Sequence, residues 1–148
     1  MTLLPGWHPI VVHFPIALVM TATSCLAAAR LLRREDYAAT LATVGTWNLC
    51  LGALAALFAL ATGLAAVLGL QVGEAARAAI SMHVKWAVFT TVALLLAAVW
   101  RGAGNAQQSR PSWVFIILLL LATAALGVTG YRGGQNVYRY GVGVMAPR

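Results

Sequence analysis

Three histidines are the residues of this sequence best suited to hold a metal or a metal-containing cofactor. His8 and His13 stand near the N-terminus, and His83 stands near the middle of the chain. A neutral imidazole offers one ring nitrogen as a ligand, and it suits iron, copper and zinc. The two cysteines, Cys25 and Cys50, lack the spacing of a metal-binding motif and are interpreted as packing residues.

The residues that most enzymes need are scarce. The only carboxylates are Glu35, Asp36 and Glu74, all between apolar segments, and no nucleophile has a base at a plausible spacing. No glycine-rich loop precedes a phosphate-binding helix. The sequence therefore favours an electron carrier or an accessory subunit over a stand-alone enzyme.

The composition indicates that these residues are positioned by membrane helices. The chain has 148 residues, of which 61% are hydrophobic and 9% charged, too apolar for a soluble domain. Four apolar runs are each near the ~20 residues that cross a bilayer. We predict an all-α, polytopic four-transmembrane-helix bundle, a single membrane domain over residues 1–148, with helices at about 10–32, 44–70, 82–100 and 113–131 and a polar, glycine-rich tail at 132–148.

Small residues inside these runs predict close helix packing. The second run contains Gly45, Gly52 and Gly63, and the fourth contains Gly127 and Gly130. Without side chains, such positions let helix backbones approach one another in a bilayer. We therefore expect a compact bundle surrounded by lipid.

Arginines suggest how the bundle is oriented. The first and third connections carry Arg30, Arg33, Arg34, Arg101 and Arg110. By the positive-inside rule these connections lie in the cytoplasm and both termini lie outside, although the three arginines of the tail argue for the opposite orientation. The net charge of +7 reflects these scattered arginines, which form no dense stripe for nucleic acid.

The polar side chains of the spans converge on one membrane face. His8 and His13 begin the first helix, His83 and Lys85 begin the third, and Arg132 ends the fourth. The distances along the helices to Arg30 and Arg101 are about 26 Å from His13 and about 27 Å from His83, at ~1.5 Å per residue. Two imidazoles at equal height on different helices are typical of a site for haem b. Five residues separate His8 from His13, so the two do not share a helix face. We favour His13 as the partner of His83, because Pro9 is expected to begin the helix and His8 would then precede it.

Other interpretations of the same residues remain open. His8, His13 and His83 together predict a copper or zinc site as an alternative, and each could be an ordinary end group of a helix. Lys85 and Arg132 suit the propionates of a haem, with Tyr131 beside them, or they anchor helices in an interfacial belt.

Two segments resemble a known family. HPIVVHFPIAL at His8–Leu18 and GGQNVYRYGVGV at Gly133–Val144 are similar to the signatures of the bacterial membrane family called domain of unknown function 2231. ALATGLAAVLGL at Ala59–Leu70, followed by His83, resembles the middle of that family. The resemblance implies a four-helix protein of a bacterial inner (cytoplasmic) membrane. It also implies a link to electron transfer, because some members are joined to c-type cytochrome domains.

The expected function is that of a small b-type cytochrome with a haem held by His13 and His83 near the periplasmic face. Its expected partners, besides the lipid bilayer, are a c-type cytochrome, a quinol or a larger respiratory complex, and homo-oligomers are left open. A cofactor-free accessory subunit of a redox complex is a further alternative.

Overall fold

The chain folds into five helices, the first two of which share one crossing of the bundle. The computed structural model describes residues 4–104 and 110–144. The helices are α1 (Leu4–Val11), α2 (His13–Leu31), α3 (Glu35–Leu68), α4 (Glu74–Gly104) and α5 (Trp113–Tyr138). Four helical stretches are long and apolar enough to cross a membrane, and one of them joins α1 to α2 as Trp7–Leu31. The predicted all-α, four-helix membrane bundle is confirmed.

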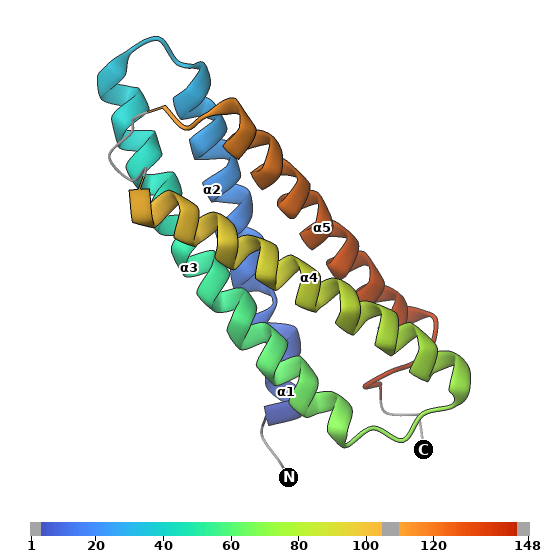
Figure 1. Cartoon of the computed structure of the whole chain (residues 1–148). Helices are drawn as coiled ribbons and strands as arrows, with labels where there is room; N and C mark the ends of the chain where they lie inside the picture. Colours follow the sequence, from blue (N-terminus) through green and yellow to red (C-terminus); the bar gives the residue numbers. More distant parts are fainter. Residues whose placement is uncertain (1–3, 105–109, 145–148) are drawn as a thin grey trace.

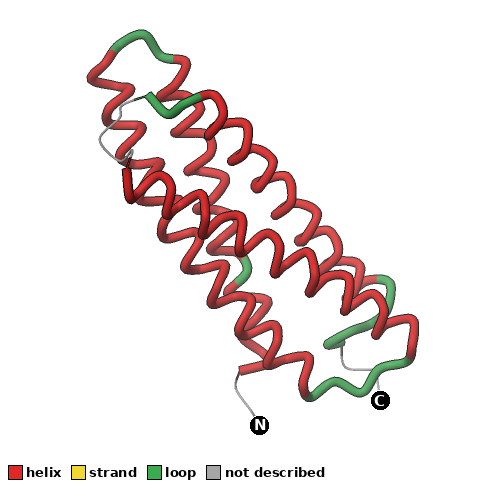
Figure 2. Tube along the Cα trace, viewed as in Figure 1, coloured by secondary structure: helices red, strands yellow, loops and turns green. Residues whose placement is uncertain are grey.

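A single residue, Val12, separates α1 from α2, and Pro15 explains the break (Figure 2). Pro15 has no backbone N–H, so the carbonyl of Val11 four residues earlier loses its helical partner, and the proline ring crowds it. The helix resumes at once because the Val12 N–H still donates to the His8 carbonyl at 3.1 Å. Val12 itself keeps helical torsion angles, with φ −62° and ψ −21°, so α1 and α2 form one crossing.

Four of the helices form a closed ring. In it α2 packs on α3, α3 on α4, α4 on α5 and α5 on α2, whereas α1 packs only on α2 and α3. Successive crossings run in opposite directions, so the start of α1, the end of α3, the start of α4 and the end of α5 lie together (Figure 1). We call this the histidine end, and the opposite end the arginine end.

Small residues let α2 and α3 approach closely. A Cβ on Gly45 would lie 2.6 Å from Leu26 Cγ, and a Cβ on Gly52 would lie 2.9 Å from Val19 Cγ2. The close packing predicted for these two glycines is confirmed. For Gly127 and Gly130 the prediction was wrong, because a Cβ on either would meet nothing within 4 Å. The core that surrounds the α2–α3 contact contains Val19, Ala22, Leu26, Leu49, Ala53, Ala56, Leu94, Phe115, Ile116, Leu119 and Ala122.

The helices are longer than the hydropathy predicted. Helix α3 begins at Glu35 instead of near 44, α4 begins at Glu74 instead of near 82, and α5 continues through residue 138 instead of ending near 131. Hydropathy marks only the part of a helix that lies in lipid, and polar turns beyond it stay helical. The first turns of the predicted tail therefore belong to α5. That helix ends where Gly141 takes a φ of 65° and the Val142 N–H donates back to the Asn136 carbonyl at 2.9 Å.

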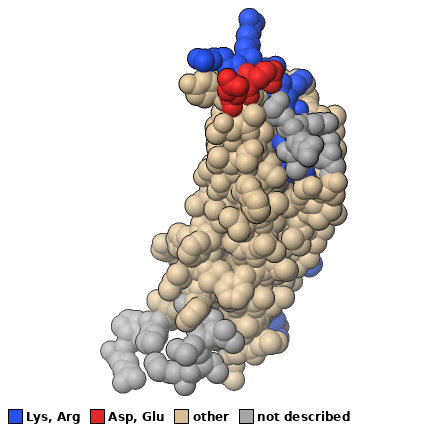
Figure 3. All heavy atoms as spheres, turned by 90° about the vertical axis from the view of Figure 1, so that its left-hand side faces the viewer, with Lys and Arg blue, Asp and Glu red and all other residues tan. Residues whose placement is uncertain are grey.

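Charged side chains gather at the arginine end, as Figure 3 shows. Arg110 pairs with Glu35 at 2.7 Å, and the Arg30 guanidinium lies 5.1 Å from the centre of the Trp113 ring. Arg101 is 1% exposed, and its Nε donates to Thr46 Oγ1 at 3.0 Å. These contacts tie the connections between the helices together at this end.

Candidate functional site

His8 lies on α1 and turns its half-buried ring against α3. The ring Nδ1 lies 3.0 Å from the Ala59 carbonyl oxygen and 3.3 Å from Thr62 Oγ1. A carbonyl only accepts hydrogen bonds, so Nδ1 carries the proton and donates it. The ring rests on Gly63, where a Cβ would lie 2.8 Å from His8 Cε1. Only glycine leaves room for the imidazole at this point.

His83 repeats this arrangement on the other pair of helices. Its half-buried ring extends from α4 to α5, where Nδ1 lies 3.1 Å from the Thr129 carbonyl oxygen. A Cβ on Gly133 would lie 3.1 Å from His83 Cε1. As at His8, Nδ1 is therefore the donor and a glycine provides the space.

The two histidines occupy equivalent half-sites, which we define as His8 with Ala59 and Gly63, and His83 with Thr129 and Gly133. In each, a histidine near the start of one helix donates to a carbonyl near the end of an antiparallel helix, and the glycine follows that carbonyl by four residues. The proton on Nδ1 leaves the Nε2 of each neutral ring with its lone pair. The histidine end thus contains two imidazoles, each held in one orientation by a backbone carbonyl.

His13 is placed differently from the other two histidines. It is exposed at the start of α2, whereas His8 and His83 have half-buried rings. The five-residue separation of His8 and His13 directs the two side chains to different helix faces.

The other predicted site residues lie around the rim of the histidine end. Lys85 is exposed on α4. Arg132 is half-buried on α5, and its buried Nε has no hydrogen-bond partner among the described residues. Tyr131 is 68% exposed and its hydroxyl accepts a hydrogen bond from Gln135 Nε2 at 3.0 Å. Of the three, only Arg132 turns part of its side chain inward.

Sequence reasoning missed three groups that the structure brings to this end. Thr62 contacts the His8 ring, and the Thr129 hydroxyl lies 3.0 Å from Thr90 Oγ1 near His83. Asn136 is 7% exposed, and its Oδ1 has no partner among the described residues. A search for threonine or asparagine next to the glycines or one helical turn from them would have found Thr62, Thr129 and Asn136.

The three histidines do not form a common metal-binding cluster. In the described part of the chain, no three His, Cys, Asp or Glu side chains come close enough to share a metal ion. The arrangement offers nitrogen ligands in a pair, one from each half-site.

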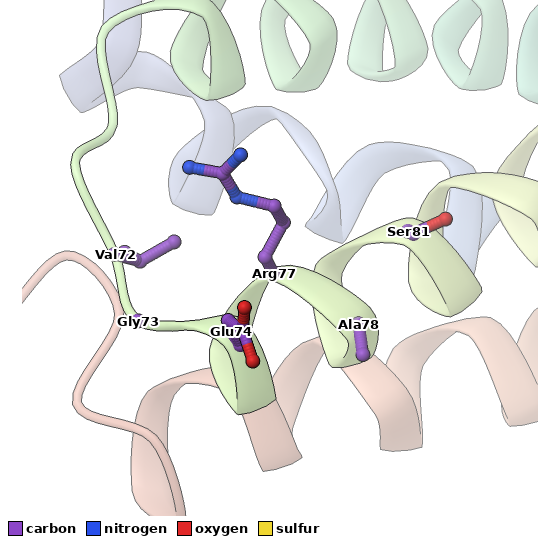
Figure 4. Close-up of a pocket in the computed structure, with 6 residues that line it drawn as sticks. All are labelled: Val72, Gly73, Glu74, Arg77, Ala78 and Ser81. Atoms are coloured by element: carbon purple, nitrogen blue, oxygen red, sulfur yellow. The ribbon is translucent and has the colours of Figure 1, made fainter.

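Two open hollows border the histidine end. One is lined by residues of the α3–α4 connection and the first turns of α4, and Figure 4 shows Arg77 extending from α4 back toward that connection. The other lies on the outer side of α5, where Tyr131, Gly134 and Tyr138 line it. Neither hollow is lined by a histidine, so the half-sites are distinct from both.

The family follows from the match over the whole bundle. A family model described as predicted membrane protein, DUF2231, matches residues 5–146, which include both half-sites. The chain belongs to the DUF2231 family. The resemblance found in the sequence is therefore confirmed. No curated protein and no solved structure matches this DUF2231 chain.

Proposed function

We propose that this protein is a membrane-embedded b-type cytochrome that carries single electrons, with a haem held between His8 and His83. The observation that carries the proposal is the pair of equivalent half-sites. Each histidine donates from Nδ1 to a backbone carbonyl at 3.0–3.1 Å and keeps Nε2 free of a proton. Histidines that ligate metals typically hold their other ring nitrogen in this way, which fixes the ring and raises its basicity.

Two features around the rings support a haem. Gly63 and Gly133 give the imidazoles room against α3 and α5, and the neighbouring spans are apolar. Arg132 and Lys85 stand at the same end, where cationic groups would meet the propionates. The buried Nε of Arg132 is a donor ready for such a carboxylate.

When bound, the haem would supply one-electron chemistry. The protein's part would be to orient the two imidazoles, exclude water with its apolar spans and hold the propionates at the rim. His8 and His83 would both be used to hold the haem, and the chemistry it would supply there is the transfer of single electrons. Electron transfer is therefore the proposed role.

The proposed location is a bacterial inner membrane, with the histidine end and both termini on the periplasmic side. Arginines of the two connections at the opposite end support this orientation. A quinol or a larger respiratory complex would supply the electron, and a c-type cytochrome would accept it.

The test is a reduced-minus-oxidised optical spectrum of protein purified in detergent, for wild type and three variants. His8→Ala and His83→Ala are expected to lose the Soret and α bands of a bis-imidazole haem. His13→Ala is the matched control, because His13 is exposed, and it is expected to keep them. Wild type without a Soret band, or His83→Ala with an unchanged spectrum, would refute the proposal.

Metal analysis of the same samples separates the other functions considered. Stoichiometric copper or zinc in the wild type that is lost from all three histidine variants would support a copper or zinc site instead of the haem. Protein without haem or metal that co-purifies with a redox complex would indicate an accessory subunit.

A further inference from the structure

The two half-sites differ in how many groups accept the histidine proton. The Nδ1–H of His8 faces two oxygens, the Ala59 carbonyl at 3.0 Å and Thr62 Oγ1 at 3.3 Å. The Thr62 hydroxyl donates its own proton to the Ala59 carbonyl at 2.9 Å. Its oxygen is therefore an acceptor toward the His8 Nδ1–H. The three groups form a closed triangle, and Thr62 is 4% exposed.

Among the described residues, no hydroxyl plays this part in the second half-site. The Nδ1 of His83 has the Thr129 carbonyl as its acceptor at 3.1 Å. The Thr129 hydroxyl points elsewhere, because it donates to the Ala125 carbonyl at 2.9 Å and lies 3.0 Å from Thr90 Oγ1. One imidazole is thus held by two acceptors and the other by one.

We propose that Thr62 is a positioning residue that fixes the His8 imidazole and tunes the iron it ligates, an inference that rests on the proposed haem. A second acceptor for Nδ1–H gives the imidazole more anionic character and makes Nε2 a stronger electron donor. A stronger donor stabilises ferric over ferrous iron, so the Thr62 hydroxyl lowers the reduction potential.

The first test is potentiometric titration of the haem-loaded protein in Thr62→Val, Thr62→Ser and Thr43→Val. Valine keeps the shape of threonine and removes the hydroxyl, whereas serine keeps the hydroxyl. Thr43 is the matched control, because it lies on α3 and its hydroxyl donates to the Ala39 carbonyl, but it is exposed. We expect the midpoint potential to rise in Thr62→Val and to stay at the wild-type value in the other two.

The second test needs no haem. In haem-free protein labelled with ¹⁵N-histidine, the Nδ1–H resonance of His8 is expected to shift in Thr62→Val and to return toward its wild-type position in Thr62→Ser. The resonance of His83, whose hydrogen bonding does not involve Thr62, is the internal control. An unshifted His8 resonance would overturn the positioning role.

The outcomes separate this inference from the proposed function. A Thr62→Val protein with an intact Soret band and the wild-type potential overturns the tuning role and leaves the haem proposal standing. Loss of haem from Thr62→Val with retention in Thr62→Ser supports the positioning role, and loss from both variants overturns it. Wild type without haem overturns the proposed function and the tuning with it, while the resonances of His8 still test the positioning.

Discussion

Gly63 and Gly133 show how much of the candidate site depends on the absence of a Cβ atom at single positions. A methyl group on Gly63 would lie 2.8 Å from His8 Cε1, inside the contact distance, and the imidazole would have to move. We expect Gly63→Ala to cost roughly 1–3 kcal/mol of unfolding free energy, as overpacked positions do. Reversible unfolding in mixed micelles measures this cost.

The matched control is Gly127→Ala, because a Cβ on Gly127 would meet nothing within 4 Å. That change is expected to leave the stability equal to or above that of wild type, since alanine favours a helix over glycine. Equal stability of Gly63→Ala and Gly127→Ala would mean that the His8 ring is not confined against α3.

A second prediction at this scale concerns Thr46, the acceptor for the Nε of Arg101. Thr46→Val removes that acceptor from a guanidinium that is 1% exposed. The unfolding free energy should fall by about 1.5–3 kcal/mol, the usual contribution of a hydrogen bond to a charged group. Thr40→Val, an exposed position on the same helix, should change it little. Equal losses in the two variants would contradict the role given to Thr46.

The residue types and the membrane face of the candidate site could be predicted from the sequence, but the inward-facing histidine of the first helix could not. Spacing correctly separated His8 from His13, since five residues do not return to one helix face. Choosing between them required the rotation of each helix about its axis. That rotation is set by the tertiary packing of α1 on α3, which the local sequence does not show.

At the scale of the elements, the break between α1 and α2 leads to a third prediction. Pro15→Ala restores a backbone N–H that can bond to the Val11 carbonyl, so the two helices should merge. A continuous helix would swing α1 away from its place on α3. Spin labels on α1 at Trp7 and on α3 at Leu64, both exposed positions, should then report a changed distance distribution.

Pro9→Ala provides the comparison for this experiment. Pro9 already lies inside α1 without breaking it, so its replacement should leave the label distances unchanged. An unchanged distribution in Pro15→Ala would show that packing on α3, and not the proline, sets the direction of α1.

The helices themselves illustrate what hydropathy detects. Each predicted span lies within or close to a helix of the structure, because the ~20 apolar residues needed to cross a bilayer are visible in composition. The turns from Glu35 to Val44 and from Glu74 to Ser81 escaped prediction, since their charged and polar residues interrupt the apolar run that hydropathy detects. The same holds for the end of α5, where Gly133 and Gly134 suggested a loop. Both glycines are helical, and the small size of Gly133 is used for packing against the ring of His83.

At the scale of the whole molecule, the concentration of charge at the arginine end makes the orientation testable. In intact cells, a cysteine at Asp36 should be protected from a membrane-impermeant maleimide, and a cysteine at Gly73 should react. The reason is the excess of arginines beside Asp36, which by the positive-inside rule would place that end in the cytoplasm. The experiment uses a background in which Cys25 and Cys50 are replaced by alanine.

Permeabilised cells supply the control, because both introduced cysteines should then react. Labelling of Asp36→Cys and protection of Gly73→Cys in intact cells would reverse the orientation. The proposed haem would in that case lie near the cytoplasmic side, and its electron acceptor would have to be sought there.

The division of the bundle into two half-sites also bears on how the chain is made. The first half-site lies entirely within residues 4–68 and the second within 74–138, so neither borrows a residue from the other. During synthesis the N-terminal part of a chain folds first. His8 can therefore reach its carbonyl and its glycine while α4 and α5 are still unsynthesised. The His8 imidazole therefore has its hydrogen-bond acceptor in the membrane before the second half of the chain is made.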